Sequence, residues 1–235
     1  MTTIAGILFD KDGTLFDFNA TWGAWAGRVL TDLAAQAEVD RDALGARVGY
    51  SFETGFAPNS PIIAATVPEI ALQLAGGLPR CDPSDLVDYL DAQAAAAQVV
   101  EVVPLAKFLA DLGTRGLRLG VMTNDSEASA RAHLAAVGVA DVAAGGSLEV
   151  VIGADSGHGA KPSPEPLLAF ARHIDLAPEN LVMVGDSRHD LSAGRAAGMV
   201  TVGVLTGPAK HTDLADLADV ILPSIADLPQ WLSQR

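Results

Sequence analysis

From Val100 to the end of the chain, short apolar runs alternate with longer segments of helical periodicity. Each run matches a buried strand, and the segments between them are long enough for crossover helices. An earlier run, Ile4–Phe9, adds a strand near the start. This alternation predicts an α/β fold with a doubly wound, mainly parallel sheet. The expected strands are Ile4–Phe9, Leu117–Met122, Leu148–Ile152, Leu181–Val184, Val200–Val204 and Val220–Leu222, and the expected helices are Pro104–Thr114, Glu127–Val137, Pro164–Ile174, Asp190–Ala197, Asp213–Leu217 and Ile225–Leu232.

The segment between the first strand and the alternating region has a different pattern of apolar residues. Residues 18–99 carry helical periodicity and few strand signals. The sequence therefore predicts a discontinuous α/β core, residues 1–17 and 100–235, with an inserted α-helical cap at 18–99. Within the cap we expect helices over 20–37 with Asn19 as N-cap, over Pro61–Leu74, and from Pro83 or Ser84 to Ala97.

Charge and composition limit the classes of partner. The chain has 235 residues, with 15 basic and 29 acidic side chains and a formal net charge of -14. Such a surface repels nucleic acid and anionic membranes. No apolar run is long enough to span a bilayer, and we see no signal peptide. With Cys81 as its single cysteine, the chain is expected in the cytoplasm, as a monomer or homodimer.

Polar side chains follow four of the expected strands, where ligand sites form in sheets of this kind. They are Asp10 and Asp12 after the first strand, Thr123 and Asn124 after the second, Lys161 in the loop after Ile152, and Asp186 and Asp190 after Val184. Because carboxyl ends of parallel strands share one edge of the sheet, we expect these groups to converge there.

Two carboxylates two residues apart, just before Gly13, suit phosphoryl transfer. One can attack phosphorus to form an aspartyl-phosphate, and the other can move the proton. The attacking carboxylate and the phosphate repel, so a divalent cation has to bridge them, and Mg²⁺ prefers oxygen ligands. We expect Asp10, Asp186 and the backbone carbonyl of Asp12 as ligands. Lys11 is expected to contribute its backbone amide alone.

Taken together and in this order, the motifs resemble those of haloacid dehalogenase superfamily phosphatases with a helical cap. The matching stretches are Asp10-x-Asp12-Gly13-Thr14, Thr123-Asn124, Lys161-Pro162 and Gly185-Asp186-x-x-x-Asp190. The resemblance implies a Rossmann-like core. It also implies that Asp10 is the nucleophile, Asp12 the acid/base, Lys161 the stabilising cation that also contacts phosphate, Thr123 and Asn124 the phosphate-binding pair, and Asp186 a metal ligand joined by Asp190, directly or through a neighbour.

The sequence thus predicts a Mg²⁺-dependent phosphatase of a small phosphorylated metabolite. The segment Gly203–Gly207 is further similar to phosphoglycolate phosphatases, which makes phosphoglycolate one candidate substrate. Asp12 argues against a dehalogenase, because family dehalogenases do not need a second Asp. Two alternatives stay open, a phosphomutase of a sugar phosphate and a non-catalytic phosphate-binding protein.

The cap offers few groups that could bind a substrate carboxylate. Its basic residues are Arg28, Arg41, Arg47 and Arg80; one of them could bind such a group, but each taken singly is expected to be a surface residue. Trp22 and Trp25, three residues apart on a helix, are expected to pack in the core or at a hinge rather than line a substrate site.

Overall fold

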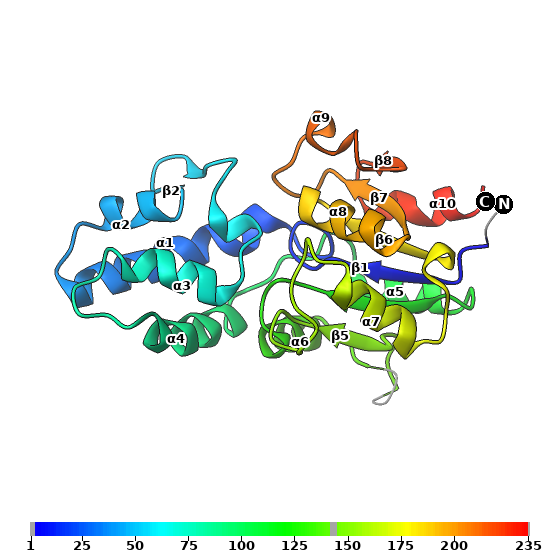
Figure 1. The fold of residues 1–235 in the computed structure, drawn as a ribbon, viewed down its shortest axis with the longest axis horizontal. Coiled ribbons are helices and arrows are strands. Elements are labelled where there is room, and N and C mark those ends of the chain that lie inside the picture. Colours follow the sequence, from blue (N-terminus) through cyan, green and yellow to red (C-terminus); the bar gives the residue numbers. More distant parts are fainter. Residues whose placement is uncertain (1–2, 142–144, 235) are drawn as a thin grey trace.

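A computed structural model describes residues 3–141 and 145–234 of the chain. Six strands form one sheet in the order β5-β4-β1-β6-β7-β8, and every neighbouring pair is parallel (Figure 1). The predicted doubly wound α/β fold is confirmed. The strands are β1 (Gly6–Phe9), β4 (Arg118–Met122), β5 (Val150–Ile152), β6 (Leu181–Gly185), β7 (Val200–Val204) and β8 (Val220–Leu222).

Side chains of the central strand alternate between two hydrophobic clusters. Ile7 and Phe9 of β1 belong to one cluster, whereas Leu8 belongs to the other. This is the two-residue period of a strand that is covered on both faces. A continuous apolar run such as Ile7–Phe9 is therefore the expected signature of a buried parallel strand.

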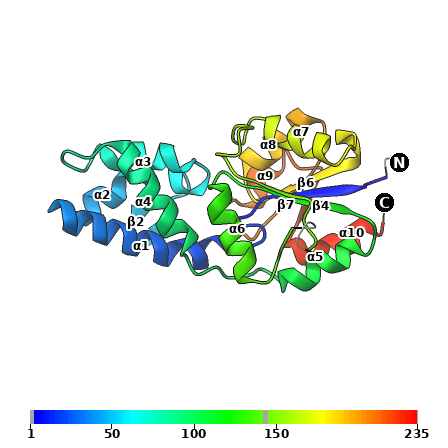
Figure 2. The same cartoon turned by 90° about the horizontal axis from the view of Figure 1, so that it is seen from below.

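Helices cover both faces of the sheet (Figure 2). α7 and α8 lie on one face, and α5, α6 and α10 lie on the other. Their bounds are α5 (Leu105–Gly113), α6 (Glu127–Ala136), α7 (Glu165–His173), α8 (Arg188–Ala197), α9 (His211–Leu214) and α10 (Leu228–Leu232). The predicted helix Asp213–Leu217 is wrong in position, because Asp213 accepts the backbone N–H of Lys210 and so stands in the first turn of α9.

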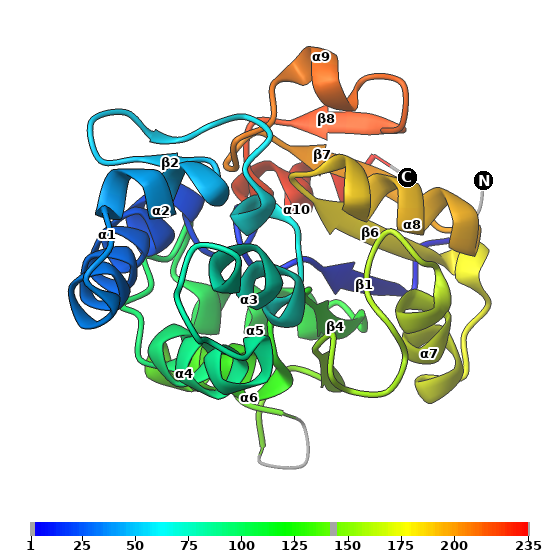
Figure 3. The same cartoon turned by 60° about the vertical axis from the view of Figure 1, so that its left-hand side comes forward.

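The helical cap lies beside the sheet and comes forward in Figure 3. Its own hydrophobic cluster includes Trp25, Leu30, Leu74 and Leu90. A separate cluster supports treating the cap as a unit, and its boundaries at 17/18 and 99/100 stay a prediction. The elements are α1 (Phe18–Ala37), α2 (Arg41–Arg47), β2 (Tyr50–Ser51), β3 (Gly55–Phe56), η1 (Pro61–Ile63), α3 (Val67–Ala75) and α4 (Pro83–Ala95).

Two starts of cap helices differ from the prediction. Asp17, not Asn19, caps α1, because its carboxylate accepts the N–H of Ala20. The expected helix Pro61–Leu74 is divided into η1 and α3, and α3 begins anew with a capping box between Thr66 and Glu69.

The two chain crossings between core and cap are hydrogen-bonded to each other. The N–H of Asp17 donates to the carbonyl of Val100 at 2.8 Å, and the N–H of Val102 donates to that of Leu15 at 3.0 Å. Both ends of the cap therefore leave the core at one point. No helix in the described ranges is long and apolar enough to cross a bilayer.

Candidate active site

The predicted site residues converge at the carboxyl ends of β1, β4 and β6. The backbone N–H of Asp10 donates to the carbonyl of Val184 at 2.8 Å, which extends the β1–β6 pairing to the nucleophile candidate. One pocket is lined by all seven predicted site residues, namely Asp10, Asp12, Thr123, Asn124, Lys161, Asp186 and Asp190. Convergence at one sheet edge is what the parallel topology requires.

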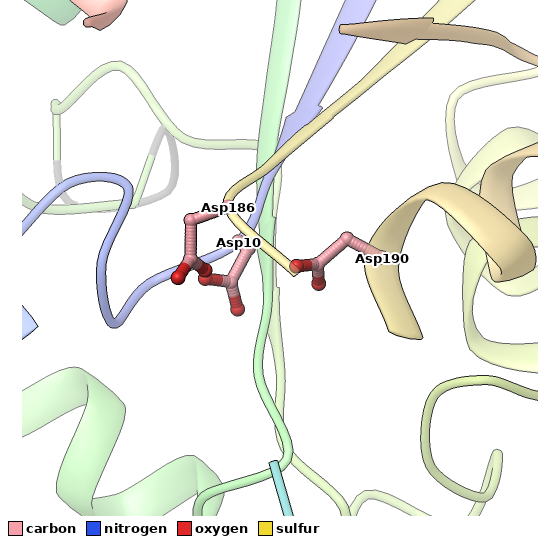
Figure 4. A group of neighbouring side chains, drawn as sticks. All are labelled: Asp10, Asp186 and Asp190. Atoms are coloured by element: carbon pink, nitrogen blue, oxygen red, sulfur yellow. The ribbon is translucent and has the colours of Figure 1, made fainter. Parts of the chain in front are cut away.

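Three buried carboxylates form a cluster in this pocket (Figure 4). One oxygen each of Asp10, Asp186 and Asp190 lies within 4.8 Å of the others. Burial, together with the charge of Asp190, raises the pKa of Asp10 to about 7. Burial and the neighbouring charges of Asp10 and Asp190 likewise raise the pKa of Asp186 well above its usual value. The cluster therefore resists carrying all its negative charges without a compensating cation.

Lys161 supplies part of this compensation. Its Nζ lies 2.5 Å from Asp10 Oδ1 and 2.6 Å from Asp190 Oδ1, and it donates to the carbonyl of Met122 at 3.0 Å. Although burial opposes its charge, the two carboxylates outweigh that effect and raise the pKa of Lys161. When all three carboxyl groups are ionised, the cluster and the ammonium of Lys161 together carry a net charge of about -2. A divalent cation that prefers oxygen ligands would neutralise this charge.

The two oxygens of Asp190 have different partners. Its Oδ2 accepts hydrogen bonds from the hydroxyl (2.6 Å) and the backbone N–H (3.0 Å) of Ser187, forming the capping box of α8. Its Oδ1 faces Lys161. Asp190 therefore starts the helix and also belongs to the acidic cluster.

The carboxylate of Asp186 sits between two glycines. A Cβ on Gly13, whose φ is +83°, would lie 2.5 Å from Asp186 Oδ2, and a Cβ on Gly207 would lie 1.6 Å from the same atom. Thr206 Oγ1 donates to the carbonyl of Gly13 at 2.6 Å and joins the two loops. The contribution of Thr206 and Gly207 was missed from the sequence, where the segment Gly203–Gly207 served only as a resemblance.

Asp12 is held by donors that sequence reasoning did not assign. Lys11 Nζ lies 3.0 Å from Asp12 Oδ1 and 2.8 Å from Oδ2, and the indole Nε1 of Trp22 donates to Oδ1 at 2.8 Å. The prediction that Lys11 contributes only its backbone is wrong, because its side chain is fully buried in this network. Trp22 packs against Trp25 as expected, yet both also line the pocket.

The network around Lys11 extends to α6 and to the loop that precedes it. Lys11 Nζ lies 3.1 Å from Asp125 Oδ2 and 3.1 Å from His133 Nδ1. Because an ammonium only donates, Nδ1 accepts and Nε2 donates to the carbonyl of Ala94 at 2.8 Å. Burial and the Lys11 charge lower the pKa of His133, which favours this neutral form.

Asn124 is engaged by the protein itself. Its amide nitrogen donates to the carbonyls of Ala64 in the cap (2.7 Å) and Lys161 (2.9 Å), and its oxygen accepts the N–H of Lys161 (2.9 Å). These bonds fix the loop that carries Lys161. Thr123 Oγ1 accepts the N–H of Asp125 at 3.1 Å, so its hydroxyl proton can face a ligand. Phosphate binding by both residues stays a prediction.

Comparison with families and curated proteins places this geometry in context. Residues 4–198 match the family model described as haloacid dehalogenase-like hydrolase. The chain is 33% identical over 236 residues to a plasmid-encoded phosphoglycolate phosphatase of Cupriavidus necator, covering 97% of this chain and 92% of that protein. It is also 38% identical over 126 residues to phosphoglycolate phosphatase of Escherichia coli K12, and that match spans 53% of this chain and 48% of that relative, about half its length.

Solved structures show the same fold. CbbY from Rhodobacter sphaeroides, crystallised with phosphate, superposes with a TM-score of 0.73 at 22% identity and covers 96% of each chain. At that identity the likeness concerns the arrangement of elements alone.

Proposed function

Since the chain belongs to the haloacid dehalogenase-like hydrolase family, we propose that it is a Mg²⁺-dependent phosphatase that cleaves a small phosphomonoester through an aspartyl-phosphate on Asp10. The observation that carries the proposal is the pairing of Asp10 with Lys161 inside a buried cluster of three carboxylates. The cation beside Asp10 favours its charged, nucleophilic form, and the excess of acids fits a divalent metal.

In the first step, Asp10 attacks phosphorus. A bond forms between a carboxylate oxygen and phosphorus while the ester bond breaks, and the leaving oxygen takes a proton from Asp12. Lys161 offsets negative charge at Asp10 and on the phosphoryl group. In the second step, water gives its proton to Asp12 and displaces Asp10 from phosphorus, which releases phosphate.

The donor set fits Mg²⁺. Asp10, Asp186 and Asp190 each offer an oxygen, and the carbonyl of Asp12 would be a further ligand. When bound, the cation would neutralise charge on the phosphoryl oxygens and on Asp10. Gly13 and Gly207 keep the space beside Asp186 clear, since a side chain at either position would overlap its carboxylate.

For the substrate we propose a small phosphorylated metabolite. The names of the relatives make 2-phosphoglycolate the first compound to try. The cytoplasm and a monomer or homodimer stay predictions from the sequence.

Phosphate release from a panel of phosphomonoesters, with and without Mg²⁺, tests the proposal. We expect Asp10→Asn to lower kcat/KM by at least about a thousandfold. Asp42→Asn, which changes an exposed carboxylate of α2, is the matched control and should keep wild-type turnover. Turnover by Asp10→Asn at the wild-type rate would refute the nucleophile. Turnover that depends on a sugar bisphosphate would favour the mutase, and phosphate binding without turnover would favour the binding protein.

A further inference from the structure

The two sides of the pocket differ in chemistry. The core side carries the acids and Lys161 described above. Among the residues that the structure describes, the cap contributes eleven to the lining, and none of them carries a charge; the side-chain polar groups among them are the indole N–H groups of Trp22 and Trp25. The eleven include Phe18, Trp22, Trp25, Ile63, Ile70 and Leu90. With the phosphate held at Asp10, the rest of a substrate would lie against this apolar side.

The cations of the cap lie elsewhere. Arg47 Nε donates to the carbonyl of Gln73 at 2.7 Å, and Arg41 lies over the ring of Phe52 at 4.4 Å. Neither they nor Arg28 and Arg80 are among the described residues that line the pocket. In this geometry no cap arginine is placed to bind a carboxylate of a substrate held at Asp10.

The core side offers no free cation in compensation. Lys161 is already shared by Asp10 and Asp190, and Lys11 is shared by Asp12 and Asp125. Within the described lining, the other basic side chain is His189, which is exposed at the mouth of the pocket. A second anionic group on the substrate would lose hydration without gaining a cationic partner, which is unfavourable.

We propose that the preferred substrate is a phosphomonoester of an uncharged, apolar alcohol, of the size of a small ring or branched chain. This inference rests on the phosphatase activity proposed above and names the substrate class of that site. The pocket has a free volume of only about 70 Å³, so the organic group of the substrate has to be small. The tryptophan pair, with ring centroids 5.2 Å apart, offers a rigid surface against which such a group packs. On this basis a carboxylated ester such as 2-phosphoglycolate is a poorer substrate.

Two probes matched in size test the inference. Benzyl phosphate and 4-carboxybenzyl phosphate differ by one carboxylate at the end remote from phosphorus. Calorimetric binding to Asp10→Asn with Mg²⁺ separates recognition from turnover. We expect benzyl phosphate to bind at least about tenfold more tightly, and wild-type kcat/KM for it to exceed that for 2-phosphoglycolate. Equal affinities, the reverse order, or binding of neither probe would overturn the inference.

A new cation in the lining provides the second test. Ile63 lines the pocket and is only half-buried, so an arginine is tolerated there. Ile63→Arg should abolish or reverse the preference for benzyl phosphate. Gln36→Arg, which places the same charge on an exposed part of α1 outside the pocket, should retain it. An unchanged preference in Ile63→Arg would show that the missing cation is not the cause.

These readouts keep the two proposals apart. If the wild type hydrolyses no phosphomonoester of the panel yet Asp10→Asn prefers benzyl phosphate, the proposed phosphatase function fails and the ligand class stands. If the wild type hydrolyses both probes equally well, the phosphatase stands and the proposed selectivity fails.

Discussion

The indole Nε1 of Trp22 donates a 2.8 Å hydrogen bond to Oδ1 of Asp12. Trp22 belongs to α1 of the cap, whereas Asp12 follows β1 of the core. A pocket-lining residue of the cap thereby holds the acid/base candidate of the core in place. A cap displaced from the core would lose this bond.

Trp22→Phe should lower kcat by about 10- to 100-fold, since a hydrogen bond to a charged group contributes about 1.5–3 kcal/mol. Phenylalanine keeps an aromatic ring against the pocket, so KM should move less than kcat. Steady-state kinetics of Trp25→Phe give the control, because the Trp25 indole nitrogen has no hydrogen-bond partner among the described residues. Equal losses in both variants would mean that ring packing, not the bond to Asp12, is responsible.

Lys161→Met should reduce the free energy of unfolding by about 3–5 kcal/mol and abolish turnover. The substitution leaves the carboxylates of Asp10 and Asp190 buried without their shared cation. Removing one partner of a buried ion pair is strongly destabilising, because the remaining charge is left uncompensated. Lys107→Met, which breaks an exposed pair with Asp111, should cost less than about 1 kcal/mol. Urea denaturation measures both, and a similar cost for the two variants would contradict the account.

Without divalent cations, stability should fall as pH rises. The pKa of Asp10 is about 7 in the folded protein against 3.8 as its ordinary value, so the folded state binds more protons between these limits. The free energy of unfolding contributed by Asp10 is therefore present near pH 4 and lost as pH approaches 7. Denaturation in a chelator at pH 5 and pH 8 should show this loss in the wild type and a smaller one in Asp10→Asn.

Mg²⁺ should stabilise the protein more at pH 8 than at pH 5. A bound cation needs ionised carboxylates, so protons compete with it in the lower range. Thermal melts of the wild type with and without Mg²⁺ at both pH values test this, and Asp42→Asn should behave as the wild type. A Mg²⁺-induced shift of equal size at both pH values would show that Asp10 does not take part in binding the cation.

Gly13→Ala should impair both folding and activity. The position has a φ of +83°, and an added Cβ would lie 2.5 Å from Asp186 Oδ2. Gly55→Ala is the matched control, because Gly55 has a φ of +78° with nothing within 4 Å of an added Cβ. The difference in turnover between the variants reports the displacement of Asp186, and the loss of stability they share reports backbone strain.

The strands of the sheet could be predicted from the sequence for a physical reason. Strands buried on both faces leave uninterrupted apolar runs, so Gly6–Phe9 and Leu181–Gly185 lie within a residue or two of their predicted ranges. The meeting of Asp10, Lys161 and Asp186 also followed, because the carboxyl ends of parallel strands share an edge. Those inferences depend on local pattern and topology alone.

The contacts around Asp12 depend on tertiary placement that no local pattern encodes. His133 lies on α6, far along the chain from Lys11. Its Nδ1 contacts Lys11 Nζ only because the fold brings α6 next to the loop that follows β1. Trp22 lies on α1, which begins at Phe18, two residues before the expected start, and its contact with Asp12 depends on how α1 packs against the core. Residue spacing alone predicts neither contact.

The paired backbone bonds at Asp17–Val100 and Val102–Leu15 have an evolutionary consequence. The cap is an insertion whose two ends are held together by these bonds, so its length has little effect on the stability of the sheet. Doubling such an insertion adds only about 0.6 kcal/mol of closure entropy. A lineage could therefore exchange or enlarge this segment while every strand keeps its register, and new substrates could be acquired without altering the residues that break the phosphate ester.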